Sequence, residues 1–90
     1  MKIKSNYVLQ EIDDEFLVVP IAEEADRLHG VIRLNETGAF LWRCLEKDDF
    51  KTISDLKTAL IHEYGISEVR AYQDVSSFIN QLEDLGCIQE

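Results

Sequence analysis

The 90-residue sequence has few glycines, cysteines and histidines. Its four glycines are well separated, which excludes a glycine-rich loop for phosphate binding. The two cysteines, Cys44 and Cys87, are too far apart for a C-x-x-C site, so we expect small buried side chains rather than a disulfide or metal ligands. The two histidines, His29 and His62, have no second ligand at a metal-binding spacing. We therefore expect no metal site and no cofactor.

Catalytic residue types also lack a suitable setting. No serine lies in a G-x-S-x-G turn, and Ser67 is better explained as a helix cap. The acidic pairs Asp13-Asp14 and Glu23-Glu24 lie in turn-like segments, which are poor places for acid–base catalysis. The sequence therefore predicts a protein that is not an enzyme.

Positive charge is scarce, because nine basic residues face eighteen acidic ones and the net charge is −9. Nucleic-acid binding normally draws on a basic patch, and none exists here. The acidic balance tolerates a partner with Lys and Arg, although solubility explains acidity at least as often. No apolar run approaches the roughly 18–20 residues of a membrane span, and the strand-like pattern at the start of the chain leads us to expect no signal peptide. We expect a cytoplasmic protein that binds neither nucleic acid nor membrane.

Ninety residues make one domain, 1–90, and 46% hydrophobic with 30% charged residues is typical of a folded protein. The hydrophobic pattern predicts strands at about 7–12, 16–21 and 30–34. Asp13-Asp14 marks the turn of a hairpin between the first two, and Pro20 indicates a strand end or edge. Residues 22–29 are either a loop or one helical turn.

The stretch from Gly30 to Leu45 changes from strand to helix. Ile32 and Leu34 alternate with neighbours of the opposite face, and at Asn35 the period becomes helical. Asn35 can cap this first helix, predicted at about 36–47, and Trp42 lies on its apolar face. We expect Trp42 to belong to the core, with the lining of a groove as the alternative.

Two further helices are predicted at about 53–64 and 68–85. Thr52 and Asp55 have the spacing of a capping box, and Gly65 can end the second helix. Ser67 can cap the third helix and Gly86 can end it, before a short extended tail. The predicted fold class is α+β, with an N-terminal three-stranded antiparallel sheet followed by three helices. The last two helices form a helix-turn-helix, and the sheet takes the place of a wing.

These residues resemble the PqqD family, which is named for pyrroloquinoline quinone biosynthesis and grouped with recognition domains for ribosomally made, post-translationally modified peptides. The family pattern L-N-x-T/S-x-x-x-[IL]-W is matched by Leu34, Asn35, Thr37, Leu41 and Trp42. Further matches are Asp74-Val75 inside the third helix and the motif near its end, Leu82 to Ile88. The resemblance covers nearly the whole chain and implies a winged-helix-like arrangement.

The resemblance implies a non-catalytic peptide chaperone that binds the leader of a precursor peptide by strand addition. It would present that leader to a modifying enzyme, often a radical S-adenosylmethionine enzyme in this family. In the family, the leader pairs with the third strand and packs against the third helix. Carried over to this sequence, the implied peptide-binding residues are Gly30, Val31, Ile32, Arg33, Tyr72, Ser76, Ile79 and Glu83.

Two alternative functions remain at this point: a transcriptional regulator, and an adaptor of the same PqqD-like fold that serves an unrelated pathway. A winged-helix DNA-binding transcriptional regulator would need basic residues on its recognition helix, but between Glu68 and Leu85 Arg70 is the one basic residue against four acidic ones. An open sheet edge can also be satisfied by a second copy of the chain, which would give a homodimer. The sequence does not specify the precursor, the enzyme, or whether the product is pyrroloquinoline quinone.

Overall fold

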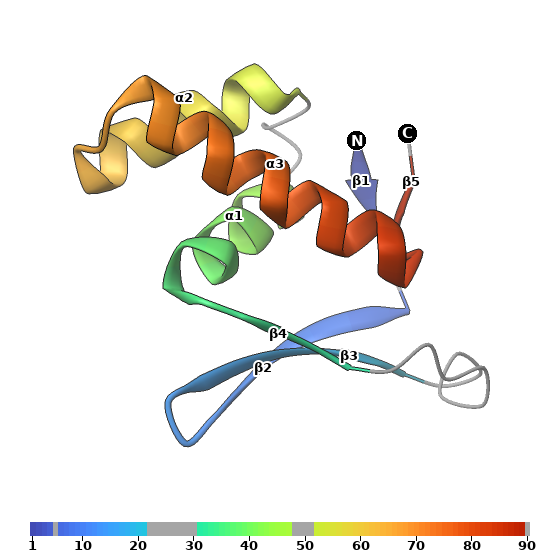
Figure 1. Ribbon diagram of the computed structural model, residues 1–90. Coiled ribbons are helices and arrows are strands. Elements are labelled where there is room, and N and C mark those ends of the chain that lie inside the picture. The colour runs from blue at the N-terminus through green and yellow to red at the C-terminus, as the bar shows by residue number, and fades with distance from the viewer. Residues whose placement is uncertain (5, 22–30, 48–51, 90) are drawn as a thin grey trace.

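The computed structural model describes residues 1–4, 6–21, 31–47 and 52–89. Three strands form one antiparallel sheet in the order β2 (Tyr7–Ile12), β3 (Glu15–Pro20) and β4 (Ile32–Leu34). Three helices follow: α1 (Glu36–Glu46), α2 (Ile53–Tyr64) and α3 (Glu68–Leu85). The predicted fold class, a three-stranded sheet followed by three helices, is confirmed (Figure 1).

The hairpin between β2 and β3 turns at Asp13 and Asp14, with φ angles of 50° and 66°. Two consecutive left-handed residues are typical of a two-residue type I′ turn, whose twist matches that of the flanking strands. Asp tolerates this conformation better than most residues. The second strand begins and ends one residue earlier than predicted. The third predicted strand, 30–34, corresponds to β4 and is shorter within the described residues, and Gly30 lies outside them.

A second, two-stranded sheet joins the two ends of the described chain. β1 (Lys2–Ile3) pairs antiparallel with β5 (Ile88–Gln89), and the Lys4 N–H donates to the Cys87 carbonyl at 2.8 Å. The sequence predicts an extended tail here but not its partner, because two residues are too few to show a period. This pairing fixes the end of α3 relative to the start of the chain.

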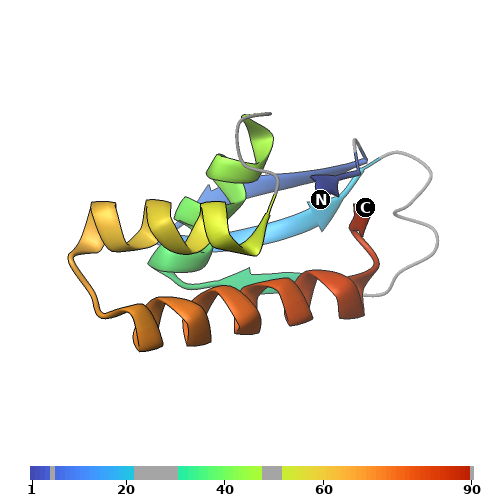
Figure 2. The same cartoon turned by 90° about the horizontal axis from the view of Figure 1, so that it is seen from above.

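The three helices lie on the same side of the three-stranded sheet (Figure 1). α3 contacts β4, α1 and α2. Viewed from above, α3 runs beside β4, with β3 and β2 farther away (Figure 2). The edge of the sheet formed by β4 is therefore the edge next to the longest helix.

The core lies between the sheet and the helices. Trp42 is 0% exposed, which confirms it as a core residue, and Cys44 and Cys87 are both buried and unbridged. The largest fully buried side chains are Trp42, Leu41, Leu56, Leu60, Leu82, Val18, Val75 and Cys87. None of the helices in the described residues is both long and apolar enough to cross a membrane.

The cap of α1 provides a test of the strand-to-helix junction. The Asn35 side chain accepts a hydrogen bond from the Gly38 N–H at 2.8 Å. We expect Asn35→Ala to lower the free energy of unfolding by about 1 kcal/mol, because that N–H loses its acceptor. Denaturant titration followed by Trp42 fluorescence measures the change. Asn80→Ala, the same substitution at an exposed position within α3, is the control and should have little effect or stabilise slightly.

Burial of Cys87 predicts a loss of stability at high pH. Desolvation raises the pKa of this fully buried thiol from 9.0 to about 11. Between these values the folded state holds a proton that the unfolded state releases, so the free energy of unfolding falls as the pH rises, by up to about 2 kcal/mol. In Cys87→Ala the decrease from pH 9 to pH 11 should be smaller. An equal decrease in both proteins, measured by urea titration at each pH, would contradict this origin.

Candidate functional site

β4 is paired on one side and open on the other within the described residues. Its partner is β3, with Leu17 opposite Arg33 and Phe16 opposite Leu34. An edge strand directs the N–H and C=O groups of alternate residues outward, where they lack a ladder partner. β4 therefore offers a template for one further strand, and the helix α3 lies beside that template.

The side chains of β4 divide between the two faces of the sheet. Leu34 is 3% exposed and Ile32 is half-buried, so both point toward the helices. Arg33 points to the opposite face and lies 3.5 Å from Glu15, in an exposed ion pair that contributes little to stability. Val31, just before β4, is 50% exposed. Of the four predicted edge residues, Val31, Ile32 and Arg33 are described; Ile32 and Arg33 lie on β4 and Val31 directly precedes it.

A tight turn joins β4 to α1. The Asn35 amide oxygen accepts from the Gly38 N–H at 2.8 Å and from the Thr37 hydroxyl at 3.0 Å. A Cβ at Gly38 would lie 3.2 Å from the Leu34 Cβ and 3.2 Å from this oxygen, so the turn leaves little room for a side chain. The end of β4 is therefore held firmly against the start of α1.

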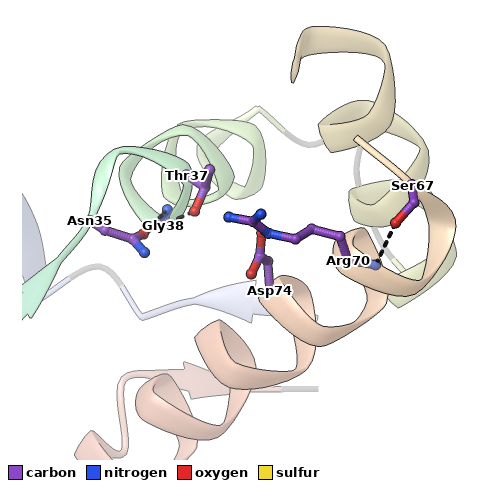
Figure 3. A network of polar contacts seen from close by, with 6 residues as sticks. All are labelled: Asn35, Thr37, Gly38, Ser67, Arg70 and Asp74. Carbon is purple, nitrogen blue, oxygen red and sulfur yellow. Dashed lines mark hydrogen bonds and ion pairs between the residues drawn. The ribbon is translucent and has the colours of Figure 1, made fainter. Parts of the chain in front are cut away.

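A small hollow of about 50 Å³ separates this turn from α3. On the α1 side it is lined by Asn35, Thr37 and Gly38. On the α3 side it is lined by Asp74, Ser77, Phe78 and Gln81, which we call the β4-side strip. Figure 3 shows the Arg70 and Asp74 side chains between the start of α1 and α3, and they form an ion pair at 3.7 Å.

The four α3 residues predicted from the sequence lie on a different strip. Tyr72 is 57% exposed, Ser76 is half-buried, Ile79 is 8% exposed and Glu83 is exposed. Successive residues of an α-helix are rotated by about 100° around its axis, so Asp74 lies about 200° from Tyr72. The strips are therefore on opposite margins of the buried face of α3.

An ion pair shows which neighbour the predicted strip borders. Glu68 lies one turn before Tyr72, on the same face of α3, and pairs with Lys57 of α2 at 3.8 Å. The strip that contains Tyr72 thus borders α2, and the β4-side strip borders the strand-to-helix turn. The sequence shows an apolar stripe with two polar margins, but it does not show which margin meets the sheet. The family match at Asp74-Val75 was the one signal for the β4-side strip.

The described residues contain no group of three or more His, Cys, Asp or Glu side chains that could hold a metal ion. The same residues include no buried charged side chain. Cys44 and Cys87 are the described thiols, and burial raises the pKa of both, which keeps them as unreactive thiols at neutral pH. The arrangement at β4 and α3 is suited to holding an extended chain through its backbone.

Comparison with known proteins gives a consistent result. No curated protein shows significant similarity to the chain. A solved structure of TbiB1 in complex with the TbiA(beta) leader peptide has a TM-score of 0.74 and 22% identity, covering 99% of this chain and 95% of TbiB1. A lasso peptide synthetase B1 complexed with the leader peptide has a TM-score of 0.72 and 16% identity, covering 99% and 96%. At these identities the likeness establishes a shared fold.

The sequence pattern of the family described as coenzyme PQQ synthesis protein D (PqqD) matches residues 7–88. The match includes the sheet, all three helices and the junction at Asn35, which is nearly the whole chain. The chain belongs to the PqqD family.

Proposed function

We propose that this protein is a non-catalytic peptide-binding domain. It binds the leader segment of a ribosomally made precursor peptide as a further strand on the open edge of β4. The observation that carries the proposal is this open edge beside α3. Two proteins of the same fold, solved with leader peptides bound, support it.

Main-chain hydrogen bonds to β4 supply part of the affinity, and side-chain contacts with the helices supply the rest. Because β4 has only three residues, the ladder alone is short. The hollow between α3 and the turn that follows β4, which is the groove of this proposal, carries more of the specificity. The β4-side strip is the wall of that groove in this proposal, in place of the strip that contains Tyr72. A leader that is disordered when free loses conformational entropy on binding, which keeps the complex reversible.

The bound leader is presented to a modifying enzyme, of the radical S-adenosylmethionine type in the family resemblance. Holding the leader raises the effective concentration of the core peptide near that enzyme, without any chemistry in this protein.

DNA binding has no supporting observation. Arg70, the one basic residue of α3, is paired with Asp74, and α3 carries more acidic than basic side chains. A recognition helix with that balance repels phosphate. We therefore favour peptide binding over a regulator.

Titration with a synthetic leader of the precursor encoded beside the gene tests the proposal. We expect backbone amide shifts at Ile32 to Leu34 and at Asp74 to Gln81, because these segments border the added strand. Absence of shifts at saturating peptide would contradict binding of that leader. Shifts confined to Tyr72 and Glu83 would instead place the peptide on the α2 side of α3. Duplex DNA in a parallel titration should produce no shifts on α3.

A pair of single substitutions separates the two strips of α3. Ser77→Arg should weaken leader binding by about tenfold, or 1.4 kcal/mol, because its long side chain fills the groove beside β4. Ser76→Arg, one residue earlier and about 100° around the helix, should change the affinity by less than about twofold. Fluorescence anisotropy with a labelled leader measures both. The reverse order of effects would assign the peptide to the strip that contains Tyr72.

A further inference from the structure

A depression of about 400 Å³ lies where β4 ends. Its apolar lining consists of the half-buried Phe16 and the buried Leu34, which are opposite each other at the end of the β3–β4 ladder. Its rim carries four carboxylates, Glu11, Asp14, Glu15 and Glu36. The depression thus combines an apolar lining with a negatively charged rim, between the tip of the β2–β3 hairpin and the start of α1.

The charges at this depression are only partly neutralised. Arg33 pairs with Glu15 at 3.5 Å and Arg43 pairs with Glu11 at 3.8 Å. Asp14 and Glu36 form no ion pair with any described residue. Four carboxylates and two guanidinium groups leave a net charge of −2, within a protein of net charge −9.

The chain already contains one guanidinium in this environment. The Arg43 guanidinium carbon lies 5.6 Å from the centre of the Phe16 ring, a cation–π distance, while its nitrogen reaches Glu11. Arg and Lys side chains suit such a setting because their methylene stems cover apolar surface and their charged heads meet carboxylates at the rim. The two unpaired carboxylates could accept a second such head.

We propose that this depression receives a Lys or Arg side chain of the bound leader, next to the segment that pairs with β4. This inference rests on the proposed peptide-binding function and adds the chemistry of the ligand to it. The depression is lined by Leu34 at the end of β4 and by Asn35 and Glu36 just after it, so a peptide paired along β4 that continues past Leu34 meets its rim. Complementary charge at that point fixes the register of the peptide on a strand that is too short to fix it alone.

Selection of random dodecapeptides displayed on phage provides the probes. Peptides that shift the backbone amide resonances of Ile32 to Leu34 are retained. Their dissociation constants are measured with the wild-type protein and with two matched double variants. Asp14→Asn with Glu36→Gln removes the unpaired charges at the depression. Glu46→Gln with Glu63→Gln removes two exposed charges near the ends of α1 and α2, as a control for overall charge. Each retained peptide is also made with norleucine in place of its basic residue.

We expect retained peptides to share a Lys or Arg at one position relative to the strand segment. The Asp14/Glu36 variant should bind them about three- to tenfold more weakly, and the control variant within about twofold. With norleucine peptides the difference between wild type and the Asp14/Glu36 variant should disappear. Peptides that shift β4 but lack a shared basic position, or that respond equally to both variants, would overturn this inference and leave peptide binding intact. Recovery of no peptide that shifts β4 would overturn the proposed function itself.

Discussion

The rest of the structure depends on the turn that joins β4 to α1. Asn35 caps the helix by accepting the Gly38 N–H at 2.8 Å, and Gly38 leaves no more than 3.2 Å between an added Cβ and the Leu34 Cβ. Leu34 is thereby pressed into the core, where α1 contributes Trp42 and Leu41. Since side chains alternate along a strand, burying Leu34 also fixes the outward face of Arg33. One cap and one small residue thus orient the open edge, the groove beside α3 and the depression at its end.

Much of this fold could be predicted because its signals are local. The cap at Asn35, the capping box at Thr52 and the left-handed glycines Gly65 and Gly86 all lie where the residue types indicate. Each of these motifs satisfies backbone groups within four residues, so no knowledge of the tertiary structure is needed. The edge at β4 was also foreseeable, because a strand that runs into a helix after a hairpin has one free side.

The features that the sequence left open are all non-local. The pairing of β1 with β5 joins residues from opposite ends of the chain and has no pattern of its own. Whether the margin of α3 with Tyr72 or the one with Asp74 faces the strand-to-helix turn depends on the rotation of α3 about its axis, and helical spacing fits either. The acidic depression combines a hairpin tip with a helix start that are separated by about twenty residues in the sequence. Only packing brings such groups together.

A short edge and weak rim contacts have a functional consequence. Three residues of strand offer few hydrogen bonds, each worth about 0.5–1.5 kcal/mol net, and exposed charge pairs add less. Affinity is then a sum of small terms, minus the entropy of ordering the peptide. In the function proposed above, the protein releases its peptide after each round of modification, so tight binding would slow turnover. Under that proposal, specificity comes from the relative placement of the edge, groove and depression, which the tightly packed turn at Asn35 sets while each contact stays weak.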